Sequence, residues 1–115
     1  MYNTHYCSQD AITIFNGDLK RLAPGEYLND NLIDLKIKHT ALTLPPPIQQ
    51  AIHVFNCMFY TCLTAHKQAE QGHKVVSRWT NKVDLFSKDY ILIPINYSYH
   101  WSLAVIVRPG AVLVS

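Results

Sequence analysis

The stretch that decides the fold runs from residue 90 to residue 107 and reads Tyr90-Ile91-Leu92-Ile93-Pro94-Ile95-Asn96-Tyr97-Ser98-Tyr99-His100-Trp101-Ser102-Leu103-Ala104-Val105-Ile106-Val107. Its first run, which ends at Ile95, is apolar, branched and too short for a helix, so it is typical of a buried strand. From Trp101 to Val107 apolar residues recur at every second position, which is the period of a strand. We therefore predict an antiparallel hairpin at the centre of a sheet, with both faces buried.

A helix is predicted ahead of this hairpin. Asn29 and Asp30 are both competent N-caps, and the residues that follow favour an amphipathic helix that ends at about Leu42. Because helices come before strands along the chain, the pattern indicates an α+β fold.

The segment between that helix and the hairpin predicts a spacer and a second helix. Pro45-Pro46-Pro47 favours an extended spacer. Apolar residues at three- and four-residue steps then predict a longer helix over residues 49–70, with Gly72 as its C-terminal stop. Residues 73–89 are expected to be irregular.

Composition sets limits on the class of protein. The chain has 115 residues, 49% of them hydrophobic and 16% charged, which suits one domain with a buried core. A net charge of +2 without a run of like charges argues against nucleic acid or an anionic membrane as a partner. No apolar stretch approaches the roughly 20 residues of a membrane span, and the N-terminus lacks the pattern of a secretory signal. We therefore expect an intracellular protein.

The two ends of the chain differ in character. Residues 1–11 are polar, and we expect them to be disordered. After Arg108-Pro109-Gly110 little sequence remains to supply the strands and the covering layer that a buried hairpin needs. We interpret residues 12–115 as the N-terminal part of a domain that is cut at its C-terminus.

The cysteines have two possible interpretations, as buried thiols or as metal ligands. Cys7, Cys57 and Cys62 are expected to be reduced thiols, mostly buried. Together with His53 and His66, two of them form a candidate zinc cluster. On one helix, however, His53 and Cys62 would face opposite sides, and such ligands cannot surround a tetrahedral zinc. With no glycine-rich phosphate loop either, we expect no metal and no cofactor.

His100 is the strongest single candidate for chemistry. It opens a strand directly after a polar loop and directly before Trp101, so its side chain is held by the sheet and stays accessible, as a general base requires. A histidine that merely ends a sheet edge would have the same surroundings. Position alone leaves both interpretations open.

Several strings are more specific when they are taken together. In order they are Pro24-Gly25-Glu26-Tyr27-Leu28-Asn29-Asp30-Asn31-Leu32-Ile33-Asp34, His53-Val54-Phe55-Asn56-Cys57-Met58-Phe59-Tyr60, Arg78-Trp79-Thr80, Val83-Asp84-Leu85-Phe86, Ile93-Pro94-Ile95-Asn96 and His100-Trp101-Ser102-Leu103. They resemble, in family order, the SUMO-specific, ubiquitin-like-protein cysteine proteases, also called sentrin-specific proteases. The resemblance runs from about Ile12 to Gly110.

This resemblance implies a papain-like fold and hydrolysis after the C-terminal Gly-Gly of SUMO or a related modifier, in the nucleus and/or the cytoplasm. It implies that His100 is the general base of a Cys-His-Asp triad. Trp101 would cover the Gly-Gly tail, with Tyr27 as the opposing wall. Asp30 would pair with a basic residue of SUMO, and Asn29 is grouped with it as a substrate-binding residue.

The chain also departs from the family pattern. It has no acidic residue after Asp89 and no cysteine after Cys62, where the family places its triad Asp and its nucleophile. We therefore expect the 115-residue chain alone to have no turnover. The alternatives are a non-catalytic SUMO-binding fragment and a non-functional truncated product.

Overall fold

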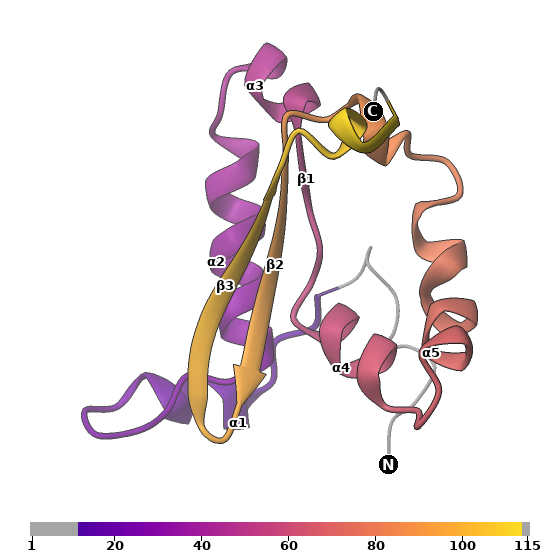
Figure 1. The fold of residues 1–115 in the computed structure, drawn as a ribbon. Coiled ribbons are helices and arrows are strands. Elements are labelled where there is room, and N and C mark those ends of the chain that lie inside the picture. The colour runs from indigo at the N-terminus through magenta and orange to yellow at the C-terminus, as the bar shows by residue number, and fades with distance from the viewer. Residues whose placement is uncertain (1–11, 114–115) are drawn as a thin grey trace.

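The computed structural model describes residues 12–113, so the disorder predicted for residues 1–11 lies outside the described residues. Figure 1 shows helices on two sides of a narrow sheet. The helices and strands are, in chain order, α1 (Asn16–Leu19), α2 (Asp30–Leu42), α3 (Pro46–Ala51), β1 (Ile52–Val54), α4 (Met58–Thr64), α5 (Ala69–Val76), β2 (Tyr90–Tyr97) and β3 (His100–Val107). Short 3₁₀ turns follow α1, α5 and β3 and precede β2.

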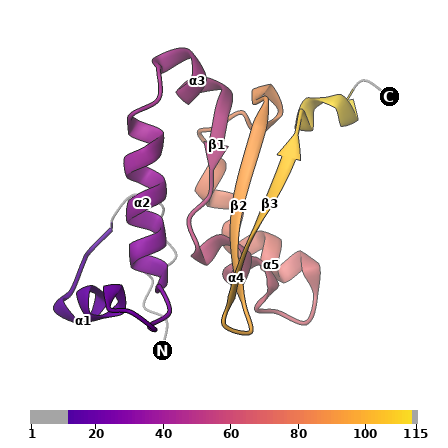
Figure 2. The same cartoon turned by 90° about the vertical axis from the view of Figure 1, so that its left-hand side faces the viewer.

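The predicted hairpin is confirmed. β2 and β3 pair antiparallel over their whole length, from Tyr90 opposite Val107 to Tyr97 opposite His100. β1 adds to the other edge of β2 in parallel, which gives the order β1-β2-β3 (Figure 2). The α+β class is therefore confirmed, with β2 as the central strand.

β3 differs from the prediction in its burial. Within the described residues it is one of the two edge strands, and Leu103 is 57% exposed. The alternation of apolar residues was correctly interpreted as a strand, but alternation alone does not say whether a neighbour covers either face. The radius of gyration is 15.2 Å, against about 13 Å for a compact domain of this length, in keeping with a sheet that is covered on part of its surface.

α2 begins and ends where the sequence predicts. Asn29 has extended backbone and acts as the N-cap, because its side-chain Oδ1 accepts a hydrogen bond of 3.1 Å from the backbone N–H of Leu32. Leu32 is the buried residue of this helix, and Leu42 is its last.

The predicted spacer at residues 45–47 is wrong. Pro45 is the N-cap of α3, and Pro46 is its first residue. Proline is excluded from a helix interior but tolerated in the first turn, where its missing N–H would have no partner within the helix.

The long helix predicted over residues 49–70 is also wrong. The segment forms the end of α3, the strand β1, the helix α4 and the start of α5. Ile52 and Val54 are β-branched and pair with β2, and the backbone N–H of Phe55 continues the pairing to the carbonyl of Leu92 at 2.9 Å. Pairing with the edge of the central strand β2 therefore outweighs the helical spacing of the apolar residues.

Gly72 does not stop a helix. It lies buried inside α5, where an added Cβ would collide with the backbone of Leu63 in α4. The glycine serves close helix packing rather than a left-handed turn. Helix α5 continues to Val76, inside the segment predicted to be irregular.

The main apolar cluster joins α4 and α5. Met58, Cys62 and Val76 are buried there, and Phe59 and Trp79 are among the partly buried side chains that pack against them. A line of rings extends the cluster towards β1. Phe59 stacks on Phe55 at 3.7 Å between ring centroids, and Trp79 meets Phe59 edge-on at 5.9 Å.

Candidate active site

The site begins with a buried carboxylate, Asp18, at the end of α1. Its oxygens accept hydrogen bonds from the backbone N–H of Phe15 (2.7 Å), from Asn29 Nδ2 (2.6 Å) and from Asn31 Nδ2 (3.1 Å). The bond from Phe15 is the main cause of a lowered Asp18 pKa, with those from Asn29 and Asn31 adding to it against the effect of burial. Asp18 therefore ties α1 to the start of α2 and fixes both ends of the loop between them.

That loop carries Tyr27. Gly25 adopts a positive φ of 82°, which glycine tolerates without strain, and the chain then reaches the start of α2. An exposed ion pair of 3.5 Å joins Arg21 to Glu26 across the loop, and such pairs contribute little to stability. The backbone geometry, more than this ion pair, sets the position of Tyr27.

The turn of the β2–β3 hairpin meets this loop at two points. The ring of Tyr99, in the turn, lies 5.9 Å from the ring of Tyr27, with 40° between their planes. The indole Nε1 of Trp101 donates a hydrogen bond of 3.0 Å to the backbone carbonyl of Leu28. Two consecutive loop residues are thus held against the residues on either side of His100.

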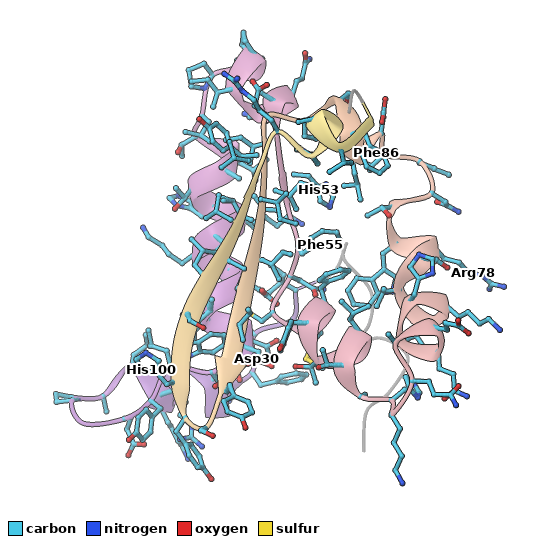
Figure 3. All side chains as sticks on the ribbon, in the orientation of Figure 1. Asp30, His53, Phe55, Arg78, Phe86 and His100 are labelled. Carbon is cyan, nitrogen blue, oxygen red and sulfur yellow. The ribbon has the colours of Figure 1, made fainter. Side chains whose placement is uncertain are left out.

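His100 is the first residue of β3 and is exposed. Figure 3 shows it at the turn end of the hairpin, beside the loop that precedes α2. Successive side chains of a strand point to opposite faces, so His100 and Trp101 project from opposite sides of β3. The imidazole is accessible while the backbone that carries it is fixed by pairing with Tyr97.

Asp30 lies on the first turn of α2, half-buried. Burial is the main cause of its raised pKa, the negative charge of Asp34 raises it further, and a hydrogen bond from the Asn96 side chain lowers it. Asn96 pairs with Trp101 in the hairpin register. The carboxylate predicted to bind a basic residue of the substrate is therefore connected, through Asn96, to the hairpin that carries Trp101.

Asp34 and Cys57 form a second polar contact, one helical turn further along α2. Asp34 Oδ1 accepts a 2.8 Å hydrogen bond from the backbone N–H of Cys57. Burial, the hydrogen bond to Asp34 and its negative charge all raise the pKa of the Cys57 thiol far above its usual range. Cys57 is therefore a protonated structural thiol and lacks the thiolate of a nucleophile.

The predicted site residues lie at one end of the sheet, but they differ in exposure and in the hydrogen bonds that they make. Tyr27 and His100 are exposed, while Trp101 and Asp30 are half-buried. Asn29 is occupied on both sides of its amide, by Leu32 and by Asp18, so its role in the structure is that of a cap. Its predicted part in substrate binding stays a prediction.

Three contributors were missed by sequence reasoning: Asp18, the carbonyl of Leu28, and Tyr99. A backbone carbonyl leaves no signal in a sequence. The signal for Tyr99 was its place in a short link between two strands, where aromatic residues are uncommon.

The four candidate metal ligands are spread over several elements. His53 lies on β1, Cys57 caps α4, Cys62 lies within α4, and His66 follows it. The geometric reason given for excluding zinc, opposite faces of one helix, therefore does not apply. Among residues 12–113 no three or more His, Cys, Asp and Glu side chains gather where they could hold a metal ion. Within the same residues no helix is long and apolar enough to cross a membrane.

Comparison with known sequences decides the family. Residues 26–111, which include every predicted site residue, match the Ulp1 protease family, C-terminal catalytic domain. The chain belongs to the Ulp1 protease family. It is 41% identical over 106 residues to ubiquitin-like-specific protease 2 of Schizosaccharomyces pombe, covering 88% of this chain and 17% of that protein. It is 36% identical over 114 residues to human sentrin-specific protease 7, covering 89% and 11%.

Solved structures of the Ulp1 family agree with the fold. The C-terminal Ulp1 protease domain in complex with Smt3, the yeast ortholog of SUMO, matches with a TM-score of 0.66 at 31% identity, over 89% of this chain and 43% of that one. SUMO protease Ulp1 with its catalytic cysteine oxidised to a sulfinic acid matches with a TM-score of 0.65 at 33% identity, over 88% and 43%. The chain thus spans less than half of these domains and less than a fifth of the curated relatives above.

Proposed function

We propose that this chain supplies the general base and the tail-binding walls of a cysteine peptidase that cleaves after the C-terminal Gly-Gly of SUMO or a related modifier. The observation that carries the proposal is a pair of contacts. Tyr27 packs against Tyr99, and Leu28 accepts a hydrogen bond from Trp101. His100 lies between Tyr99 and Trp101 in the sequence. Membership of the Ulp1 family supports it, as does the complex of a solved relative with Smt3.

In this proposal the two walls select the substrate tail. A modifier tail that ends in Gly-Gly would lie extended between Trp101 and Tyr27. Glycine suits such a passage because a β-carbon would collide with a ring. Asp30 would meet a basic residue of the folded modifier.

His100 would then act on the nucleophile. As general base its imidazole takes the proton of a cysteine thiol, and the thiolate attacks the carbonyl carbon of the terminal glycine. The imidazolium returns that proton to the departing amine when the carbon–nitrogen bond breaks.

The thiol and the carboxylate that orients His100 would come from outside these 115 residues. The chain has no acidic residue after Asp89 and no cysteine after Cys62, and the Cys57 thiol stays protonated. Loss of one triad member leaves only about 10³–10⁴-fold acceleration over water in the enzymes where it has been measured. The chain alone is therefore expected to bind without turnover.

The second candidate is a SUMO-binding protein without chemistry. It would use the same surface, and it is favoured because the two cysteines within the described residues, Cys57 and Cys62, are both buried. The location predicted from the sequence, nucleus and/or cytoplasm, suits both candidates and stays a prediction.

A graft separates the two candidates. Residues 12–113 would replace the aligned segment of the Ulp1 domain solved with Smt3, whose own cysteine then serves as the nucleophile. The graft should cleave a SUMO fusion protein, with the products detected by gel electrophoresis. His100→Ala should abolish cleavage and leave SUMO binding nearly intact, whereas His39→Ala, an exposed histidine on α2, should change neither. Cleavage that survives His100→Ala would disprove the assignment of the base.

Binding is tested on the 115-residue chain itself. Calorimetric titration with SUMO that ends in Gly-Gly should show saturable binding, weakened by Tyr27→Ala and by Trp101→Ala. A chain that is folded by circular dichroism and does not bind SUMO would refute both candidates and leave the non-functional product.

A further inference from the structure

The turn of the hairpin holds an unusual backbone conformation. Ser98 and Tyr99, the two residues between β2 and β3, have φ values of +52° and +60°. Two-residue hairpin turns require positive φ at such positions, and glycine or asparagine normally fills them. A tyrosine there costs free energy because its Cβ crowds the following carbonyl oxygen. Residues kept in such conformations concentrate at functional sites.

With the backbone in this conformation, the Tyr99 ring lies against the Tyr27 ring. The centroids are 5.9 Å apart and the planes tilt by 40°. Both side chains stay exposed, Tyr99 at 81% and Tyr27 at 63%. Little area is buried between them, so hydrophobic stabilisation of the fold does not explain why the strain is kept.

The pair does explain how Tyr27 is positioned. The loop between α1 and α2 is fixed at its ends by Asp18, and Leu28 is fixed by Trp101 Nε1. The Tyr27 side chain projects from this loop, and its ring contact with a neighbour is to Tyr99. Removal of the Tyr99 ring leaves the loop in place and frees the Tyr27 side chain to change rotamer.

We propose that Tyr99 is a specificity-determining positioning residue, which holds the Tyr27 ring as a fixed wall so that the passage beside Trp101 admits a tail without side chains. This inference rests on the proposed function and assigns Tyr99 no contact with the reacting atoms. It predicts that Tyr99 controls the choice between tails more than it controls the fold.

Tyr99→Gly separates the effect of Tyr99 on the fold from its effect on tail selection, because the substitution relieves the backbone strain and removes the ring. Tyr99→Gly should leave the melting temperature of the 115-residue chain unchanged or raise it. It should weaken binding of SUMO that ends in Gly-Gly by about three- to tenfold, the range of an aromatic pair. It should also reduce the preference for Gly-Gly over a Gly-Ala tail by a similar factor.

Two controls make the comparison decisive. Ser98→Gly relieves strain at the neighbouring position without touching a ring, and both its affinity and its tail preference should equal those of the wild type. Tyr99→Phe keeps the ring and should also behave as the wild type. In NMR spectra without SUMO, the Tyr27 ring protons should shift in Tyr99→Gly and stay in place in Ser98→Gly.

The outcomes distinguish this inference from the function on which it rests. Wild-type binding that Tyr99→Gly leaves unchanged, in affinity and in tail preference, overturns the role of Tyr99 and leaves the proposed function standing. A folded wild-type chain that does not bind SUMO overturns the proposed function and this inference with it.

Discussion

The α4–α5 region and the turn end of the hairpin are held together by different forces. Between α4 and α5 the contacts are apolar and close, with Met58, Cys62 and Val76 buried and Gly72 against the backbone of Leu63. At the turn end a few directional hydrogen bonds fix the surface: Asp18 accepts from Asn29, Asn29 accepts from Leu32, and Trp101 donates to Leu28. The rings of Tyr27 and Tyr99 on this surface remain exposed. Substitutions in the first region are thus expected to lower the stability of the fold most, while those in the second have smaller effects on stability and change what the surface binds.

The largest effect is expected at Gly72. Gly72→Ala places a methyl group on the carbonyl of Leu63, and backbone has little freedom to move away. We expect a loss of about 3 kcal/mol or more in the free energy of unfolding, measured by urea denaturation with circular dichroism.

Gly17 in α1 is the matched control, because nothing lies within 4 Å of an added Cβ there. Gly17→Ala should be neutral or slightly stabilising. Equal midpoints for the two variants would mean that the α4–α5 contact is not as tight as described.

Asp34 connects the two regions and should give the next largest effect. Asp34→Ala removes the acceptor for the backbone N–H of Cys57, and a buried N–H without a partner costs about 2 kcal/mol. Asp34→Asn keeps an acceptor oxygen, and burial already disfavours the charge of Asp34, as its raised pKa indicates. The amide variant should therefore cost less than about 1 kcal/mol; a loss as large as that of the alanine variant would show that charge, rather than the hydrogen bond, matters here.

Asn29 tests the turn end. Asn29→Ala removes the N-cap of α2 and one donor to Asp18, so the free energy of unfolding should fall by about 1 kcal/mol. Asn29→Ser keeps the cap and loses the donor, and its loss should be smaller. If the two variants lose the same amount, the bond to Asp18, and not the cap, carries the effect.

The smallest effect concerns pH at His53, on β1. Burial and the positive charge of Lys88 lower its pKa, and its Nε2 makes no hydrogen bond within the described residues. The folded chain therefore binds a proton at His53 less readily than the unfolded chain, whose histidines titrate at about pH 6.5. Stability from the neutral ring is present above that pH and is lost as the pH falls from there through the lower pKa of the folded chain.

His53→Phe should remove this part of the pH dependence between about pH 7.5 and pH 5.5. Because His53 is only half-buried, the change should stay below about 0.5 kcal/mol. His39→Phe on the exposed side of α2 is the control, and its urea midpoints should keep the wild-type slope with pH. An unchanged slope in His53→Phe would contradict the role of burial at β1.

Prediction from the sequence succeeded where local signals and long-range contacts agree. The alternation after His100 and the cap at Asn29 both specify structure within a few residues, and β3 and α2 followed. It failed over residues 49–70, where helical spacing of apolar residues competes with pairing to β2. No property of Ile52 or Val54 alone reveals that a strand 38 residues later offers them an edge.

The residues of the candidate site could be proposed from the sequence, but the contacts that hold them in place could not. Tyr27, Asp30, His100 and Trp101 were identified from family motifs, and the structure collects them at one end of the sheet. The contacts that fix them come from Asp18, from Tyr99 and from a carbonyl of Leu28. Such contacts depend on backbone geometry, which motif spacing does not encode.

Each region contains one of the two tryptophans of the chain, so the unfolding of each region can be followed separately by fluorescence. Trp79 packs against Phe59 beside the α4–α5 cluster, and Trp101 donates its indole N–H to Leu28 at the hairpin turn. Replacing either one with phenylalanine leaves a chain with a single strongly emitting chromophore in a known environment. Heating the two single-tryptophan chains and recording their emission wavelengths would give two optical midpoints, one for each region of the same molecule.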